Sequence, residues 1–500
     1  MKKAGKISNI TLIIIVVLIL FLGIAINALI TGIMINNAGN ALTILVSTDK
    51  GENATKIDTD KSTNISVYVE TGKEKQNVVA RAGEIIDVIK TNGVVTAELV
   101  SDGDGKQFWL PTGFYYVGGT EKSGIVISDN SADNKKYAGN TNVGKDLLGN
   151  QYVWIPVDSR KIVFAQHEYN TKYALDTKWL ADDGNGNWPT YYYRNFSDWK
   201  NIHYIGNGYE DEMDENIASV EKYGGFYIGR YEAGYEKVVV DTTRYTKDKP
   251  IGDTKVPASQ YGYAAWNYIT QCDASTVCDR LNNLEGYENV RARLIDGYAW
   301  DTTVEYISDA VDSVTNSASY GNYKTGSSKS SGILTGYNVD RRVKEGKTGT
   351  TCWLDNNIIY RFEAEETIIG SRILKEDSEE DMALLRRLLT EEGTLQSDGI
   401  VDTENYQYVL SYELTTGGAE STKIKNIYDI AGNMYEWTSE IGGHNSLEEK
   451  NWGENDKTFT VFRSGGFCRN SYNYPVTYRH GDHNVVSKWI GVSFRTVLYL

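Results

Sequence analysis

The stretch that decides the fold is Ile427–Ser439, IYDIAGNMYEWTS, followed after a gap by Val461–Thr496, VFRSGGFCRNSYNYPVTYRHGDHNVVSKWIGVSFRT. The first segment places oxygen-bearing side chains around Gly432 and ends near Trp437, a large apolar residue. Carboxylate and carbonyl oxygens beside a bend are typical ligands of a hard cation. The second segment has polar and aromatic residues between the pair Gly465–Gly466 and an apolar end. We expect it to form a loop held between strands.

These motifs resemble the signature of the formylglycine-generating-enzyme (sulfatase-modifying factor) family, whose usual form is GN-x-x-EW, then R-GGS, then GFR. Three upstream segments follow the order of that family's other landmarks: YVWIPV at 152–157, GFYIGRYEAG at 225–234 and RLIDGYAWDTTVEY at 293–306. The resemblance spans roughly residues 108–500. It implies an α+β domain with a C-type-lectin-like fold.

The family's enzymes oxidise a substrate cysteine with copper(I) held by two cysteine thiolates. In this chain the corresponding segment holds only Cys468. A soft metal such as copper(I) requires sulfur ligands, so we expect no catalysis, with a copper-dependent oxidase as the alternative. His480 and His483 are close in sequence, but two imidazoles alone are a weak metal signal.

The resemblance also implies a cofactor, because the family's C-terminal calcium site falls on Asp429, Gly432, Met434 and Glu436. Oxygen ligands with one or two carboxylates suit Ca²⁺. The alternative is purely structural: Asn433 would cap the turn, and Glu436 would pair with an arginine such as Arg495.

A third implication is ligand binding, since the same scaffold carries variable binding proteins diversified by retroelements near a GFR-like end. Tyr and Arg are frequent anchors of protein interfaces. We therefore expect an extracellular protein or glycan ligand, bound by a fixed adhesin surface or by a diversified receptor. The candidate contact residues are Arg469, Asn470, Ser471, Tyr472, Asn473, Tyr474, His480, Asp482, His483 and Asn484.

Composition limits the partners. The 500 residues carry a net charge of -16 with no basic stripe, which argues against a nucleic-acid partner. Four cysteines do not make a disulfide framework. Cys272 and Cys278 could form a disulfide bond outside the cell, although sequence does not establish it.

The N-terminus reads as a membrane anchor. Lys2, Lys3 and Lys6 precede Ile10–Ile26, which is apolar except for Thr11. That length suits a transmembrane helix, and the basic flank should stay in the cytoplasm. We expect a single-pass cell-membrane protein with its C-terminal domain extracellular. The alternatives are a cleaved signal peptide and a type IV pilin-like helix in a minor pilin subunit.

The predicted domains are the basic flank and helix at 1–40, a small β-rich stalk at 41–107, and the family-like domain at 108–500 with an insertion around 340–420. Apolar spacing predicts paired helices at Ala264–Leu281 and Tyr298–Val311. Within the insertion, Ser378–Glu392 has a capping serine, a leucine face and a following Gly393, which predicts an amphipathic helix.

Overall fold

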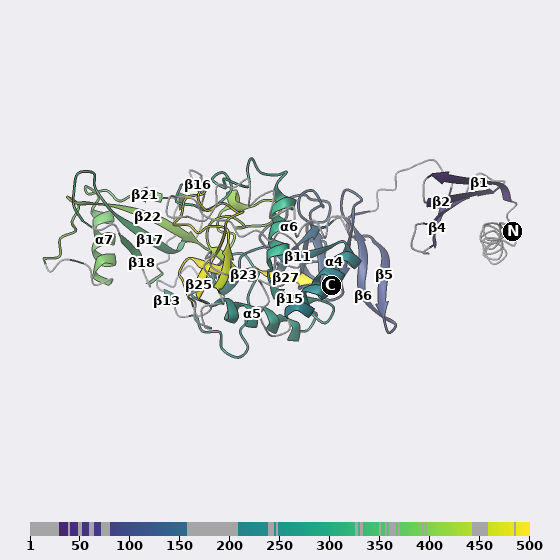
Figure 1. Cartoon of the computed structure of the whole chain (residues 1–500), viewed down its shortest axis with the longest axis horizontal. Coiled ribbons are helices and arrows are strands. Elements are labelled where there is room, and N and C mark those ends of the chain that lie inside the picture. The colour runs from purple at the N-terminus through teal and green to yellow at the C-terminus, as the bar shows by residue number, and fades with distance from the viewer. Residues whose placement is uncertain are drawn as a thin grey trace, which may run out of the picture. The chain divides into compact units, whose positions relative to one another are not determined.

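The chain forms two compact units, Met1–Val79 and Ala80–Leu500, in a computed structural model (Figure 1). The sequence analysis placed the end of the stalk at residue 107. In the structure, residues 80–107 instead belong to the larger unit. The structure describes these residues: 30–38, 41–48, 53–59, 65–71, 81–157, 209–238, 245–246, 249–325, 329–330, 334–349, 352–355, 358–359, 367–368, 371–391, 395, 398–442, 459–484 and 487–500.

The smaller unit contains an antiparallel sheet in which each strand pairs with the next along the chain. Its strands are rich in Ile, Val and Thr, the β-branched residues that pack well on a pleated surface. They are β1 (Ile30–Ala38), β2 (Ala41–Thr48), β3 (Asn53–Thr59) and β4 (Ile65–Thr71).

The expected fold class, α+β with a preceding transmembrane helix, is wrong. The described residues form a mostly β structure, and their longest α-helix has 15 residues. No helix within the described ranges is long and apolar enough to cross a bilayer. Ile30–Ile35, within the predicted N-terminal region 1–40, belongs to strand β1, whereas the predicted anchor Ile10–Ile26 lies outside the described residues. The predicted single-pass membrane location with an extracellular domain is contradicted by the same finding.

The larger unit begins with an antiparallel three-stranded sheet of β5 (Ile85–Thr91), β6 (Val94–Ser101) and β7 (Gln107–Pro111). Asn92 and Gly93 join β5 to β6, both with positive φ (53° and 83°). That conformation is the one a two-residue hairpin turn requires, which explains the Asn-Gly pair.

The main sheet of this unit has six strands in the order β15-β27-β11-β10-β9-β8. Both of its faces are buried, because alternate residues of β10 enter different cores. Val153 and Ile155 pack in the core that includes Trp300, and Tyr152 and Trp154 pack in an aromatic cluster. The strands are β8 (Tyr115–Gly118), β9 (Val126–Ser128), β10 (Gln151–Pro156), β11 (Gly225–Gly229), β15 (Arg291–Leu294) and β27 (Thr496–Tyr499).

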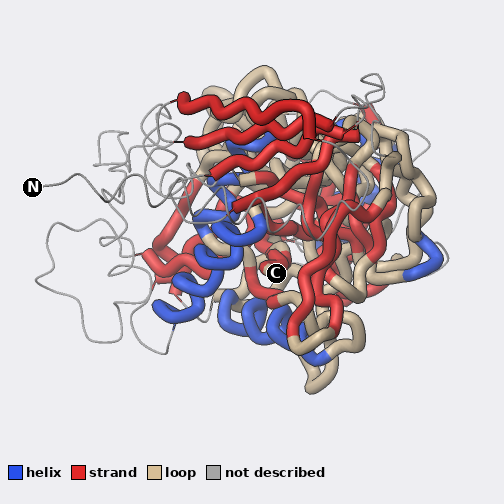
Figure 2. The backbone as a smooth tube through the Cα atoms, turned by 90° about the vertical axis from the view of Figure 1, so that its right-hand side faces the viewer, coloured by secondary structure: helices blue, strands red, loops and turns tan. Residues whose placement is uncertain are grey.

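A second sheet holds the C-terminal motifs, in the order β25-β24-β23-β26. The pair β23–β26 is parallel, while the other two pairs are antiparallel. The strands are β23 (Tyr435–Gly442), β24 (Phe459–Arg463), β25 (Arg479–Asn484) and β26 (Val492–Phe494). Figure 2 shows strands as the main regular element of the tube.

The predicted insertion forms a sheet of its own, ordered β18-β17-β22-β21. Its helix is confirmed as α7 (Glu379–Glu391), and the Ser378 hydroxyl accepts a hydrogen bond from the Asp381 amide at 3.2 Å, as expected of a cap. Leu385 and Leu389 are buried against the sheet. The strands are β17 (Leu334–Val343), β18 (Cys352–Asp355), β21 (Ser371–Ile373) and β22 (Tyr406–Leu414).

The paired helices are confirmed with shorter bounds. The first, α5 (Gln271–Asp279), begins only after the capping residue Thr270, because Tyr263–Ala265 forms strand β14. The second is α6 (Gly297–Ile307), capped by Asp296. Cys272 and Cys278 both lie on α5 as free thiols. Six residues of helix separate their Cα atoms by about 9 Å, too far for a disulfide bond.

The remaining elements are short, apart from α4 (Tyr209–Tyr223). They are η1 (Ser131–Asp133), β12 (Gly234–Lys237), β13 (Tyr245–Thr246), η4 (Arg280–Asn283), β16 (Lys329–Ser330), β19 (Ile358–Ile359), β20 (Thr367–Ile368) and η5 (Glu420–Thr422).

Candidate functional site

Arg495 lies at the junction of the two sheets, between β26 and β27, and is fully buried. Its Nη1 donates to the Gly229 carbonyl at 2.8 Å, and its Nη2 donates to the Tyr428 carbonyl at 3.0 Å. Nε and Nη2 also donate to the two carboxylate oxygens of Glu436 at 3.0 and 2.6 Å. The planar guanidinium therefore joins β11, β23 and the segment around Tyr428, which a lysine could not do with the same geometry.

Two more buried carboxylates lie near this pair, and protein donors satisfy both. Asp429 accepts from the Thr422 hydroxyl at 2.7 Å and from the Gly417 amide at 2.5 Å. Glu232 accepts from Asn433 Nδ2 at 2.8 Å and from the Met434 amide at 3.0 Å. Burial raises the pKa of all three carboxyl groups, while the positive charge of Arg495 acts in the opposite direction on each.

The turn of the motif is held by its own backbone and by Asn433. Gly432 has a φ of 76°, and a Cβ there would lie 2.4 Å from the Asn322 carbonyl oxygen, so only glycine fits. The Asn433 side chain accepts from the Leu414 amide at 3.0 Å and donates to the Leu414 carbonyl at 3.2 Å. Asn433 thus joins the turn to the end of strand β22.

This arrangement bears on the predicted Ca²⁺ site of Asp429, Gly432, Met434 and Glu436. Both carboxylate oxygens of Asp429 and of Glu436 are already occupied by hydrogen-bond donors. Within the described ranges, no group of three or more His, Cys, Asp or Glu side chains is placed to hold a metal ion. As arranged, these residues do not fit a calcium site, and the structural alternative, Glu436 paired with Arg495, is what the geometry contains.

The second candidate region is the turn that we call the display turn, residues 469–474. The Asn470 side chain accepts from the Asn473 amide at 2.7 Å, and the Asn470 carbonyl accepts from the Tyr474 amide at 3.1 Å. Between these bonds Tyr472 projects outward with 57 % of its surface exposed. Tyr472 is the one aromatic residue among the large, exposed hydrophobic side chains of the described chain.

The base of the display turn is fixed by Ser471, which is buried. Its amide donates to the Thr325 hydroxyl oxygen at 3.0 Å, and its hydroxyl donates to Asn316 Oδ1 at 3.1 Å. The Ser317 amide donates to the Ser471 carbonyl at 3.4 Å. Ser471, predicted as a contact residue, therefore belongs to the support of the turn.

The two ends of the display turn, Arg469 and Tyr474, contact each other and an aromatic stack. The Arg469 guanidinium lies 5.3 Å from the ring centre of Tyr474 and 5.6 Å from that of Trp489. Trp489 in turn stacks on the buried Tyr435, with ring centres 6.1 Å apart and planes within 5°. Such cation–π contacts restrict a long side chain, so Arg469 is held in place at the start of the display turn.

The other predicted contact residues lie on β25, an edge strand of its sheet. In the register with β24, His480 is opposite Phe462, His483 opposite Thr460 and Asn484 opposite Phe459, with Asp482 between them. The structure describes their backbone but not their side chains. Phe462 and Thr460 are two residues apart on β24, whereas their partners His480 and His483 are three apart, so β25 carries an extra residue at this irregularity.

Sequence reasoning missed three contributors. Glu232, in the quoted segment GFYIGRYEAG, holds the motif turn by a hydrogen bond from the Met434 amide. The sequence pattern gives no sign of this role, which is seen only in the structure, where Glu232 is buried. Asn316 and Thr325, which hydrogen-bond to Ser471, lie in a Ser/Gly-rich stretch. The composition of that stretch indicates a loop but does not indicate which residues it contacts.

Comparison with protein-family models, curated proteins and solved structures gives no match to this chain. The family resemblance of the motifs therefore stays a prediction, and the functional argument rests on the geometry above.

Proposed function

We propose that this protein is a non-catalytic ligand-binding protein whose contact surface is the display turn, extended by strand β25. The observation that supports the proposal most directly is the exposure of the Tyr472 side chain. This side chain offers a large, rigid, amphipathic surface at little entropic cost, which is how tyrosine serves in binding loops. The ligand class is a protein or a glycan.

Preorganisation supports the proposal. The hydrogen bonds at Asn470 and Ser471 hold the turn through the protein's own groups, so little ordering remains to oppose binding. By contrast, Cys468, the residue matching a catalytic cysteine of the family, is buried against Met434 and Phe467. A surface that is fixed at its base and exposed at its tip suits recognition.

The test is a screen of the full chain against glycan and protein arrays, repeated with Tyr472→Ala. We expect the substitution to weaken binding of any captured ligand by at least about tenfold, as for a central interface tyrosine. Leu148→Ala is the matched control, because Leu148 is also a large exposed side chain, 64 % accessible, outside the display turn. Equal binding by both variants would place the contact surface elsewhere.

Two further measurements separate the alternatives. Conversion of a cysteine peptide to an aldehyde in the presence of copper would make the protein an oxidase and overturn the proposal. Sequencing the codons for residues 461–496 in many cells of the source population distinguishes the two binding classes. Variation limited to adenine-derived positions, with Gly465, Gly466 and Arg495 constant, would indicate a diversified receptor, and a uniform sequence a fixed adhesin.

A further inference from the structure

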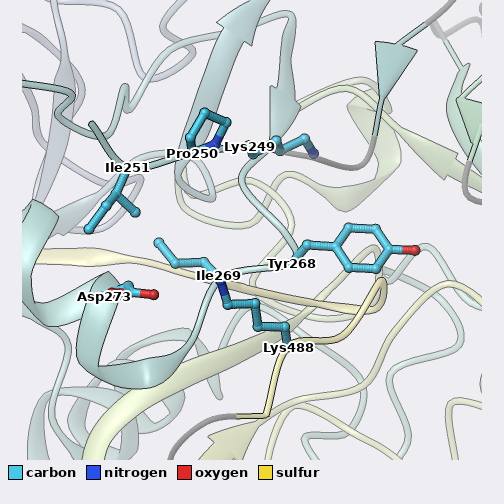
Figure 3. A pocket seen from close by; sticks show the side chains of 7 residues that line it. All are labelled: Lys249, Pro250, Ile251, Tyr268, Ile269, Asp273 and Lys488. Carbon is cyan, nitrogen blue, oxygen red and sulfur yellow. The ribbon is translucent and has the colours of Figure 1, made fainter.

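A pocket of about 290 Å³, none of whose lining residues belongs to the display turn, lies where three segments of the chain meet (Figure 3). Its volume is just below the range of roughly 300–1,000 Å³ of most small-molecule sites, which restricts it to a small ligand. The lining residues are Lys249, Pro250, Ile251, Tyr268, Ile269, Asp273 and Lys488.

The pocket wall includes a strained residue. Tyr268 has a φ of 54°, which is uncommon for a bulky side chain and clusters at functional sites when it occurs. The Tyr268 amide donates to the Trp489 carbonyl at 3.1 Å, and Asn267 Nδ2 donates to the Ile490 carbonyl at 2.7 Å. These bonds to the C-terminal segment hold the Tyr268 backbone in place, so the shape of the wall is fixed.

The two lysines of the pocket differ. Lys249 is buried, and its ammonium donates to the Ala265 carbonyl at 2.5 Å and to Asn267 Oδ1. Figure 3 shows this ammonium pointing away from Asp273 and Lys488. Lys249 therefore lines the pocket without offering its charge to a ligand, whereas the exposed Lys488 supplies the accessible positive charge.

Lys488 and Asp273 present opposite charges to the same space. In Figure 3 the Lys488 ammonium and the Asp273 carboxylate point toward one another across the pocket. The surfaces around them are apolar, from Pro250, Ile251 and Ile269. A ligand that reaches both charges needs an anionic and a cationic group a short distance apart, with an apolar remainder.

We propose that this pocket binds a free α-amino acid with an apolar side chain. The ligand's carboxylate pairs with Lys488, its ammonium pairs with Asp273, and its side chain packs against Ile251 and Ile269. Charge-assisted hydrogen bonds at both ends give the selectivity, and apolar burial adds affinity. This site goes beyond the proposed function and does not depend on the display turn.

Isothermal titration of the full chain with L-leucine tests the site. N-acetyl-leucine, which lacks the ammonium, and leucinamide, which lacks the carboxylate, are the matched ligands. We expect L-leucine to bind at least about tenfold more tightly than either, because each loses one charged hydrogen bond. Lys488→Gln and Asp273→Asn should each weaken L-leucine binding by a similar factor. The control variants are Lys122→Gln and Asp253→Asn, both at exposed positions outside the pocket.

The outcomes are decisive in either direction. Absence of leucine binding, or binding that Lys488→Gln and Asp273→Asn leave unchanged, overturns the site. Equal binding of leucine and N-acetyl-leucine would make it a simple anion site and overturn the ligand class. Because Asp273 lies in the first turn of α5, the unliganded melting temperature of each variant is measured first. Lys488→Gln, outside every helix and strand, provides an independent test should Asp273→Asn fail to fold.

Discussion

The junction around Arg495 and the display turn come from the same pair of sequence motifs. They differ in whether their side chains find partners inside the protein or remain exposed to solvent. At the junction, Arg495 and Glu436 are fully buried, and each finds its partner within the protein. At the display turn the bonds are concentrated at the base, and Tyr472 remains exposed. Polar residues in a motif thus indicate a binding site only when the fold leaves some of their surface accessible to a ligand.

The largest expected effect is on the junction. Arg495→Met leaves the Glu436 carboxylate buried without its positive partner, which should lower the free energy of unfolding by about 3–5 kcal/mol. Urea denaturation measures the loss. Arg291→Met is the matched control: the Arg291–Glu215 pair is partly exposed, and its loss should cost below about 1 kcal/mol.

Glu436→Gln combined with Arg495→Met sharpens this test. Removing both charges should restore part of the stability, because no unpaired ion remains in the core. A single Arg495→Met variant as stable as Arg291→Met would show that the junction does not hold the two sheets together.

A pH-dependent effect is expected at Glu413, a buried carboxyl group that lacks an arginine. Thr335 donates to one of its oxygens at 3.1 Å, and the other oxygen has no hydrogen-bond partner. Burial raises the pKa of Glu413 to about 7, from a model-compound value of 4.5, and Lys249 opposes that rise. The folded protein therefore holds a proton between pH 4.5 and 7 that the unfolded chain loses, so stability should fall as pH rises through this window.

Lys249 acts with the opposite sign above that window. Burial lowers the pKa of its ammonium to about 8 from 10.5, so the unfolded chain binds more protons between these values and stability should rise with pH. Glu413→Gln should reduce the fall below pH 7, measured as the urea midpoint at several pH values, and the raised pKa values of Glu232, Asp429 and Glu436 account for the part that remains. Glu404→Gln, at an exposed salt bridge with Lys347, should leave the fall as it is in the parent protein. A fall of the same size in Glu413→Gln and in the parent would contradict the assignment to Glu413.

The smallest expected effect is that of calcium. Since Arg495 already occupies the Glu436 carboxylate, adding Ca²⁺ or a chelator should leave the melting temperature of the parent protein unchanged. Differential scanning calorimetry measures it. A calcium-dependent rise that Glu436→Ala removes would instead establish the cation site that the motif resemblance implies.

Local signals in the sequence predicted local structure well. Ser378 and the leucines that follow it define α7, because a cap and a 3.6-residue apolar period act within one segment. The motif around Gly432 was located for the same reason, since its tight turn leaves room only for glycine.

Contacts between residues far apart in the chain could not be predicted from the sequence. Asp429 finds its donors in Thr422 and Gly417, and no pattern in the motif names them. The apolar Ile30–Ile35 segment fits a helix or a strand equally by composition, and pairing with β2 decides for the strand. Likewise, the support of Ser471 by Asn316 and Thr325 joins residues about 150 positions apart.

Strand β27 has a consequence for how the chain is made. Thr496–Tyr499 lies between β11 and β15, so the main sheet has a gap in its middle until these residues are synthesised. During translation, β11 and β15 would each expose an unpaired edge on either side of that gap. Completion of the main sheet therefore depends on slow, long-range pairing of β27 with strands much earlier in the chain, rather than on stepwise folding from the N-terminus.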